Sequence, residues 1–176
     1  MWNLLRFISR NEPDFALNIL ELLKATQRNI VFTTFGIAMA WLFYITTGSP
    51  GEFVLETFPL MVLIVILWGL VVWILDHGSL LTAQVVLQIS LIGLIIYGVF
   101  TFRIPELTLC FMVLPLIASV TIGWWYALII EVMIGMLMFW MVGTPIFPAM
   151  PQNYEGIVIA GGLTSGLLGW ATTHAM

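Results

Sequence analysis

The sequence predicts an all-α integral membrane protein, in which six transmembrane helices follow an N-terminal amphipathic interfacial helix. Hydrophobic residues make up 61% of the 176 residues and charged residues only 8%, and the mean hydropathy is +1.10. This leaves too little polar surface to coat a water-soluble fold. Because each crossing of a hydrocarbon core about 30 Å thick needs about 20 apolar helical residues, the chain after Asn29 has room for six or seven crossings and for no soluble domain.

Residues 1–28 are expected to form the amphipathic cytoplasmic segment. Pro13 suits the first turn of a helix, and the charge of Asp14 is favourable at a helix N-terminus. Beyond them, apolar side chains share one helical face, which is formed by Phe15, Ile19, Leu22, Leu23 and Thr26. This pattern is typical either of a helix that lies on the inner leaflet or of a helix that docks on a partner.

Six apolar runs separated by helix breakers follow, and residues 29–176 are expected to form a six-helix transmembrane bundle. The runs cover about 30–47, 53–75, 79–102, 107–120, 124–142 and 154–173. Glycine, proline and charged residues interrupt the chain between most of them. The fourth run is short and contains Pro115, and only residues 121–123 separate it from the fifth.

The distribution of basic residues predicts the orientation. Arg6, Arg10, Lys24 and Arg28 precede the first run, and Arg103 is the only Lys or Arg beyond it. Basic residues that flank the first span stay on the cytoplasmic side. Six crossings would therefore leave both termini in the cytoplasm, with the protein in the bacterial inner membrane.

Several kinds of chemistry are disfavoured by the sequence. Cys110 is the only cysteine and lies inside an apolar run, so it can form neither an internal disulfide nor a cysteine-based metal site. There is no glycine-rich phosphate loop and no serine or cysteine triad pattern. The net charge of −4 is scattered along the chain, which does not indicate nucleic-acid binding. The sequence therefore predicts a non-enzymatic protein without metal or cofactor.

Glu131 is the one acid well inside a predicted span. An ionised carboxylate there would be costly, so the side chain is expected to be protonated or paired with a polar group. Gln84 and Gln88 are the candidate partners, because they lie one helical turn apart in the third run. Glu131 is then either a neutral acid that fixes helix packing or an acid that relays protons or gates a ligand.

The last run contains two overlapping stripes of small residues at a spacing of four. Gly162 and Gly166 form one stripe, and Gly161, Ser165 and Gly169 form the other. Small residues on one face let another helix backbone approach closely in a membrane. We expect helix contacts here, either within the bundle or with another subunit; a glycine-lined crevice for a quinone or lipid is a further interpretation.

Two histidines fall at the cytoplasmic ends of spans. His77 follows Trp73 by four residues, and His174 follows Trp170 by the same interval. Histidine and tryptophan both suit the membrane interface, so these four residues are candidates for contact with lipid or a nearby quinone. Transmembrane haem is not expected, because its histidine ligands usually lie within the helices.

The fourth and fifth runs carry a family resemblance. Residues 111–118 read FMVLPLIA, Gly123 follows, and residues 126–129 read YALI. This order of leucine-proline-leucine, glycine and alanine-leucine resembles the multi-span membrane input regions of bacterial sensor histidine kinases, and the amphipathic start and six spans are similar too. The resemblance implies a sensory input region, although the phosphoacceptor histidine and ATP-binding motifs of that family are absent from the sequence.

Together these observations predict a non-catalytic accessory subunit that packs against other integral membrane subunits and lipids. The expected host is a larger bacterial membrane complex of respiratory or photosynthetic electron transport, such as a quinol-oxidising complex. One alternative is the membrane input region of a sensor kinase, with Glu131 and the glutamines lining a ligand pocket. Another is a small proton-coupled transporter.

Overall fold

The computed structural model describes residues 13–48 and 54–174, which form helices joined by short connections and contain no strand. The elements in order are α2 (Pro13–Gly48), α3 (Val54–His77), α4 (Leu80–Phe102), the 3-10 helix η1 (Pro105–Met112), α5 (Val113–Thr121), α6 (Trp124–Val142) and α7 (Tyr154–His174). Within these described ranges, five helices are long and apolar enough to cross a membrane, and residues 105–121 form a shorter apolar segment. The predicted class, a helical protein with several apolar membrane-type helices, is confirmed.

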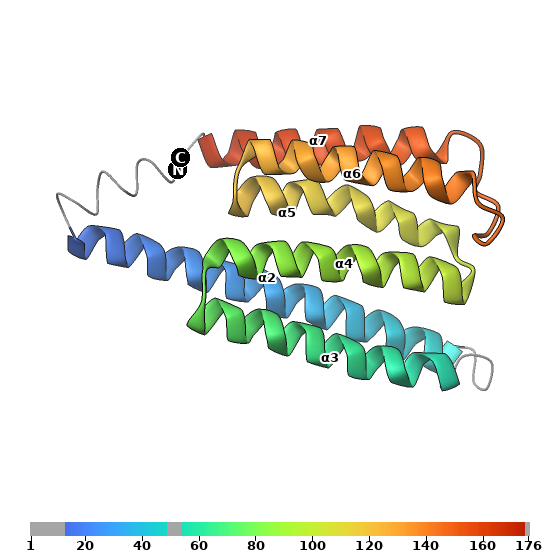
Figure 1. Ribbon diagram of the computed structural model, residues 1–176, viewed down its shortest axis with the longest axis horizontal. Helices are drawn as coiled ribbons and strands as arrows, with labels where there is room; N and C mark the ends of the chain where they lie inside the picture. Colours follow the sequence, from blue (N-terminus) through green and yellow to red (C-terminus); the bar gives the residue numbers. More distant parts are fainter. Residues whose placement is uncertain (1–12, 49–53, 175–176) are drawn as a thin grey trace. The chain divides into compact units, whose positions relative to one another are not determined.

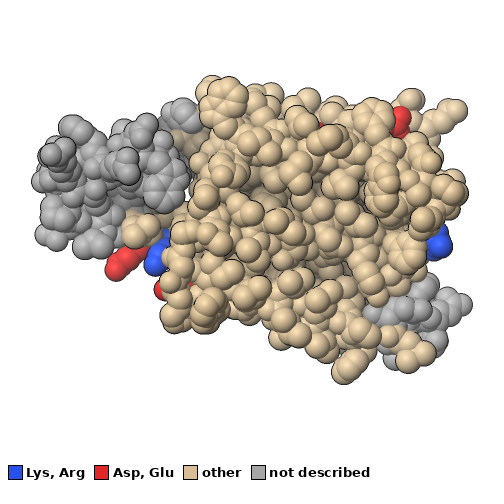
Figure 2. Space-filling model, in the orientation of Figure 1, with Lys and Arg blue, Asp and Glu red and all other residues tan. Residues whose placement is uncertain are grey.

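Internal contacts divide the chain into two compact units, Met1–Leu87 and Gln88–Met176, with the division inside α4. We call them the N-terminal and the C-terminal unit. The visible face of the molecule carries few charged side chains (Figure 2). Many large apolar residues are exposed among the described residues, and they include Leu55, Tyr44 and Trp125. An apolar surface of this extent is typical of contact with lipid or with other membrane helices.

Helix α2 is one continuous helix of 36 residues. The sequence has neither proline nor glycine between Pro13 and Gly36, so nothing interrupts the helical hydrogen bonds there. The described part of the expected amphipathic segment therefore continues into the first apolar run without a break near residue 29. Residues 1–12 of that segment lie outside the described part of the chain.

In the N-terminal unit, α2 and α3 lie side by side (Figure 1). Buried side chains on α3 recur every three or four residues, at Leu60, Ile64, Trp68, Val71 and Leu75. This spacing places them on one helical face. Trp68 connects the two helices, because its Nε1 donates hydrogen bonds to the carbonyl oxygen of Val31 at 2.9 Å and to Oγ1 of Thr34 at 3.2 Å.

In the C-terminal unit, α5, α6 and α7 pack together, and η1 contacts both α5 and α7 (Figure 1). The core includes Val99 from α4, Phe111 from η1, Leu114 from α5 and Ile134 and Met138 from α6. The chain turns from α5 to α6 at Gly123, whose φ of 133° lies in a region that side chains other than glycine rarely adopt.

Candidate functional site: buried polar residues of the helices

Polar side chains buried within apolar helices are the candidates for function, because an unsatisfied polar group is costly in a membrane. Ser119 and Thr121 satisfy their hydroxyls locally, by donating to carbonyls of their own helix. Other polar side chains of the described residues reach beyond their own helix or lie against a neighbouring one. They include Gln27, Gln88, Glu131 and Ser165, and Gln84 accepts the hydrogen bond of Gln27.

Gln27 on α2 and Gln84 on α4 form a buried pair in the N-terminal unit. The Nε2 of Gln27 donates a hydrogen bond to Oε1 of Gln84, and both side chains are fully enclosed. Sequence reasoning did not find Gln27. The available signal was its position, because Gln27 is one turn before Val31 and therefore lies on the buried stripe of α2.

Substitutions that break the glutamine pair should destabilise the N-terminal unit, and the effects of the two substitutions should not be additive. Gln84→Leu leaves the Gln27 amide buried without its partner, and Gln27→Leu does the same to Gln84. We expect each single variant to lower the free energy of unfolding by about 1 kcal/mol and the double variant to cost clearly less than their sum. Reversible unfolding in lipid–detergent micelles measures all three. Strictly additive costs would contradict the pairing.

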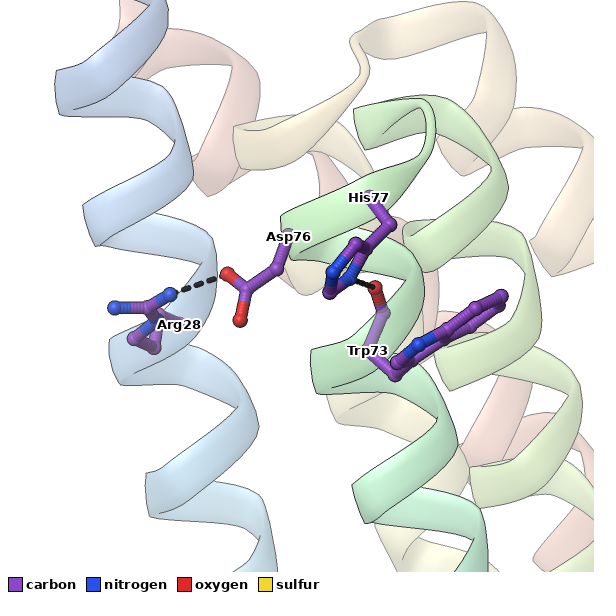
Figure 3. Close-up of polar contacts among 4 residues, drawn as sticks. All are labelled: Arg28, Trp73, Asp76 and His77. Atoms are coloured by element: carbon purple, nitrogen blue, oxygen red, sulfur yellow. Dashed lines mark hydrogen bonds and ion pairs between the residues drawn. The ribbon is translucent and has the colours of Figure 1, made fainter.

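An ion pair lies beside the glutamines. Arg28 from α2 and Asp76 from the end of α3 point toward one another and form it (Figure 3). Both side chains are partly exposed, so the ion pair adds little stability. It does show that the C-terminal end of α3 lies beside Arg28 of α2. His77 does not join it, because its Nδ1 donates to the carbonyl oxygen of Trp73 at 3.1 Å.

The predicted interfacial residues form two aromatic contacts. His77 stacks on Trp73 with the ring centres 5.4 Å apart (Figure 3). Trp170 of α7 lies against Trp124 of α6, with the ring centres 6.2 Å apart. The side chain of His174 lies outside the described part of the structure. Trp73 and Trp170 therefore each pack on a neighbouring ring of their own unit.

Gln88 and Ser165 donate to the backbone where η1 meets α5. The Nε2 of Gln88 donates to the carbonyl oxygen of Leu114 at 3.2 Å. Ser165 donates to the carbonyl oxygens of Met112 and Gly162. Pro115 has no N–H to offer the preceding turn, and neighbouring polar side chains commonly satisfy carbonyls near a proline in membrane helices. These two side chains therefore support an irregular stretch of backbone.

The contact between α6 and α7, which we call the α6–α7 seam, pairs small residues with larger ones. A Cβ built on Gly162 would overlap the carboxyl group of Glu131, with Cδ at 2.7 Å. Gly135 of α6 faces Ile159 of α7, and Gly166 of α7 lies near both Ala127 of α6 and Pro115 of α5. Glu131 is only 5% exposed. The seam thus encloses the carboxyl group against the bare backbone of a glycine.

The second stripe of α7 faces η1 and α5. A Cβ on Gly161 would lie 2.7 Å from Cε of Met112, and a Cβ on Gly169 would overlap Oγ of Ser119 and lie 3.2 Å from the carbonyl oxygen of Leu116. The small residues of α7 therefore have neighbours on two sides within the C-terminal unit.

Glu131 differs from these polar side chains because its carboxyl group forms no hydrogen bond with the described residues. Within residues 13–48 and 54–174, neither of its carboxyl oxygens has a hydrogen-bond partner. The glutamines that the sequence suggested as its partners bond elsewhere, Gln84 to Gln27 and Gln88 to Leu114. No group of three or more His, Cys, Asp or Glu side chains in the described ranges is placed to hold a metal ion.

Comparison with protein families, with curated proteins and with solved structures finds no match to the chain. Gln27, Gln84, Gln88 and Ser165 connect helices by hydrogen bonds, which is a packing role. Glu131 has the chemistry of an acid that could bind a proton or a donor group.

Proposed function

We propose that this chain is a non-catalytic integral subunit that packs against and stabilises a larger bacterial membrane complex. The observation that carries the proposal is the length of α2. Its 36 residues span about 54 Å, against about 30 Å for the hydrocarbon core. Measured from the Arg28–Asp76 ion pair, the preceding turns of α2 extend about a further 22 Å.

The continuity of α2 favours docking on a partner over lying on the inner leaflet. A helix that lay in the plane of the interface would need a sharp bend before it entered the membrane, and such bends have causes such as proline or glycine. The sequence offers neither residue between Pro13 and Gly36. Leu22, on the apolar face of this extension, is 69% exposed, which suits contact with another polypeptide.

We further propose that residues 105–121 make a sixth crossing. The eight residues of η1 rise about 16 Å at 2.0 Å per residue, and the nine residues of α5 rise about 14 Å at 1.5 Å per residue. Their combined length of about 30 Å matches the hydrocarbon core, because a 3-10 helix is more extended than an α-helix. Six crossings leave both termini on the side of the basic residues, the cytoplasm.

Single cysteines should distinguish six crossings from five. In a Cys110→Ala background, Gln152→Cys should react with a membrane-impermeant maleimide in intact cells, since six crossings place the loop between α6 and α7 outside. Ser79→Cys is the matched internal control, which should react only after the membrane is opened. Protection of Gln152→Cys in intact cells would show that residues 105–121 do not cross.

Purification of the native chain from its own membranes, without crosslinking, tests the proposed function. Redox subunits that co-migrate in a fixed ratio would support an accessory subunit of an electron-transport complex. A kinase domain that continues from the same polypeptide would instead support the sensory alternative. Deletion of residues 1–20 should reduce co-purification while the chain still inserts; unchanged co-purification would count against docking through α2.

Glu131 favours one alternative, a small proton-coupled transporter. A buried carboxyl without a partner among the described residues is the kind of group that proton relays use in membranes. Autonomous flux through the purified chain in liposomes, abolished by Glu131→Gln, would support this alternative over the accessory subunit.

A further inference from the structure

We propose that the Glu131 carboxyl is a proton-binding site built into the α6–α7 seam, and that its bound proton keeps α6 packed against Gly162. This inference concerns the residue itself and does not depend on the identity of a host complex. It rests on the enclosure of the carboxyl group, on the charges around it and on the space that the glycine leaves.

The position of Glu131 makes an ionised carboxylate costly. The residue is 5% exposed and lies seven residues after Trp124, or about 10 Å along an apolar helix. Neither oxygen receives a hydrogen bond from the described residues. A carboxylate carries a full charge and can only accept hydrogen bonds, whereas the acid form is neutral and can also donate one.

The elements packed against Glu131 bring no cation to it. Helix α5 has no titratable side chain, α6 has only Tyr126 besides Glu131, and η1 has Glu106 and Cys110. On α7, Tyr154 and Glu155 lie at the start and His174 at the end, roughly 10 Å or more along the helix from Gly162. Arg103, the only Lys or Arg after residue 87, donates to the carbonyl oxygen of Ile146.

The seam has room for a proton and not for a bulkier group beside the carboxyl. A single added Cβ on Gly162 already overlaps it. A proton neutralises the carboxylate without adding volume, so α6 can stay packed against α7 when Glu131 is protonated. Loss of the proton leaves a carboxylate in an apolar contact, which favours separation of the two helices or entry of water.

Infrared spectroscopy of the full chain in lipid bilayers tests proton binding directly. At neutral pH the wild type should show the carbonyl stretch of a protonated carboxyl, and Glu131→Gln should lack this band. Glu155→Gln, which removes an acid at the start of α7, is the matched control and should keep it. Spectra of the wild type and Glu131→Gln without any difference in this band would overturn the proposal.

Carbodiimide modification gives a second readout. Dicyclohexylcarbodiimide is apolar and should reach Glu131 from the lipid when the two helices separate transiently. The carboxyl proton then moves to a carbodiimide nitrogen, the carboxyl oxygen bonds to the central carbon, and the adduct rearranges to an N-acylurea without a leaving group. We expect mass spectrometry to find the whole reagent on Glu131 at neutral pH and not after ionisation at high pH. Equal labelling of Glu131 by a water-soluble carbodiimide would show an exposed acid and contradict the proposal.

The effect of the bound proton on the stability of the α6–α7 seam follows from the linkage between proton binding and folding. A proton that is bound in the folded seam and released on unfolding makes stability fall as pH rises. Hydrogen exchange of α6 and α7 should therefore increase at high pH in the wild type relative to Glu131→Gln at the same pH. Equal exchange in the two proteins at every pH would show that the proton does not hold the helices together.

Discussion

Gly162→Ala is expected to destabilise the α6–α7 seam by roughly 1–3 kcal/mol, the usual cost of an overpacked core. The added Cβ would overlap the Glu131 carboxyl, so the end of this side chain has to shift, and because it is only 5% exposed its neighbours have to shift with it. Gly166→Ala, one turn later on the same helix, is the matched control. Its Cβ would lie 3.4 Å from Cβ of Pro115 and 3.7 Å from Cβ of Ala127, which are ordinary contacts.

Gly166→Ala should therefore be neutral or slightly stabilising, because alanine has a higher helix propensity than glycine. A double-mutant cycle identifies the cause of the difference. If the carboxyl is the obstacle, Gly162→Ala should cost much less in a Glu131→Ala background, since the new methyl group then meets a smaller neighbour. The free energy of unfolding in lipid–detergent micelles is the measurement. Equal costs for Gly162→Ala in both backgrounds would contradict the contact between Glu131 and Gly162.

The helices were predictable because the bilayer restricts the chain to few solutions. A run of apolar residues in lipid must satisfy its backbone internally, so each long run becomes a helix. The predicted runs 124–142 and 154–173 therefore correspond closely to α6 and α7. The turn at residues 121–123 was predictable for a local reason, since Gly123 can adopt the positive φ found there.

Other features depend on information that a single sequence does not carry. The 3-10 geometry of η1 leaves no distinct residue pattern, because its side chains are as apolar as those of an α-helix. Spacing identified the small residues of α7, but not which neighbour each stripe contacts. The sequence suggested Gln84 and Gln88 as partners of Glu131, yet Gln84 bonds to Gln27 and Gln88 to the backbone of Leu114. Which helix faces which is a property of tertiary packing.

The continuity of α2 shows how two different sequence patterns can lie within one helix. The amphipathic pattern before residue 28 and the apolar run after it have different faces and composition, which suggested two segments. Helix formation depends on the absence of breakers as well as on polarity, and none occurs between Pro13 and Gly36. Gln27 therefore lies on the buried face of the same helix. Its buried position is hard to recognise from the sequence, because it lies where the composition changes from polar to apolar.

Replacement of Trp68 in α3 is the second substitution for which we expect a large loss of stability. Trp68→Ala should destabilise the N-terminal unit by roughly 3 kcal/mol or more, because it removes a large buried side chain and leaves a cavity between α2 and α3. Trp68 is 3% exposed and donates to the carbonyl of Val31. Trp73, five residues later, is 60% exposed, so Trp73→Ala should lose only its contact with His77.

Trp68→Phe separates the two contributions of the indole ring. It keeps most of the buried volume but removes the Nε1 donor, so we expect a cost of about 1 kcal/mol, close to one hydrogen bond. Hydrogen exchange of peptides from α2 is the best measurement, because α2 is the partner that Trp68 holds and contains Val31 and Thr34. Faster exchange of α2 in Trp68→Ala than in Trp73→Ala supports the contact. A similar increase in both variants would mean that α3 does not bind α2 through Trp68.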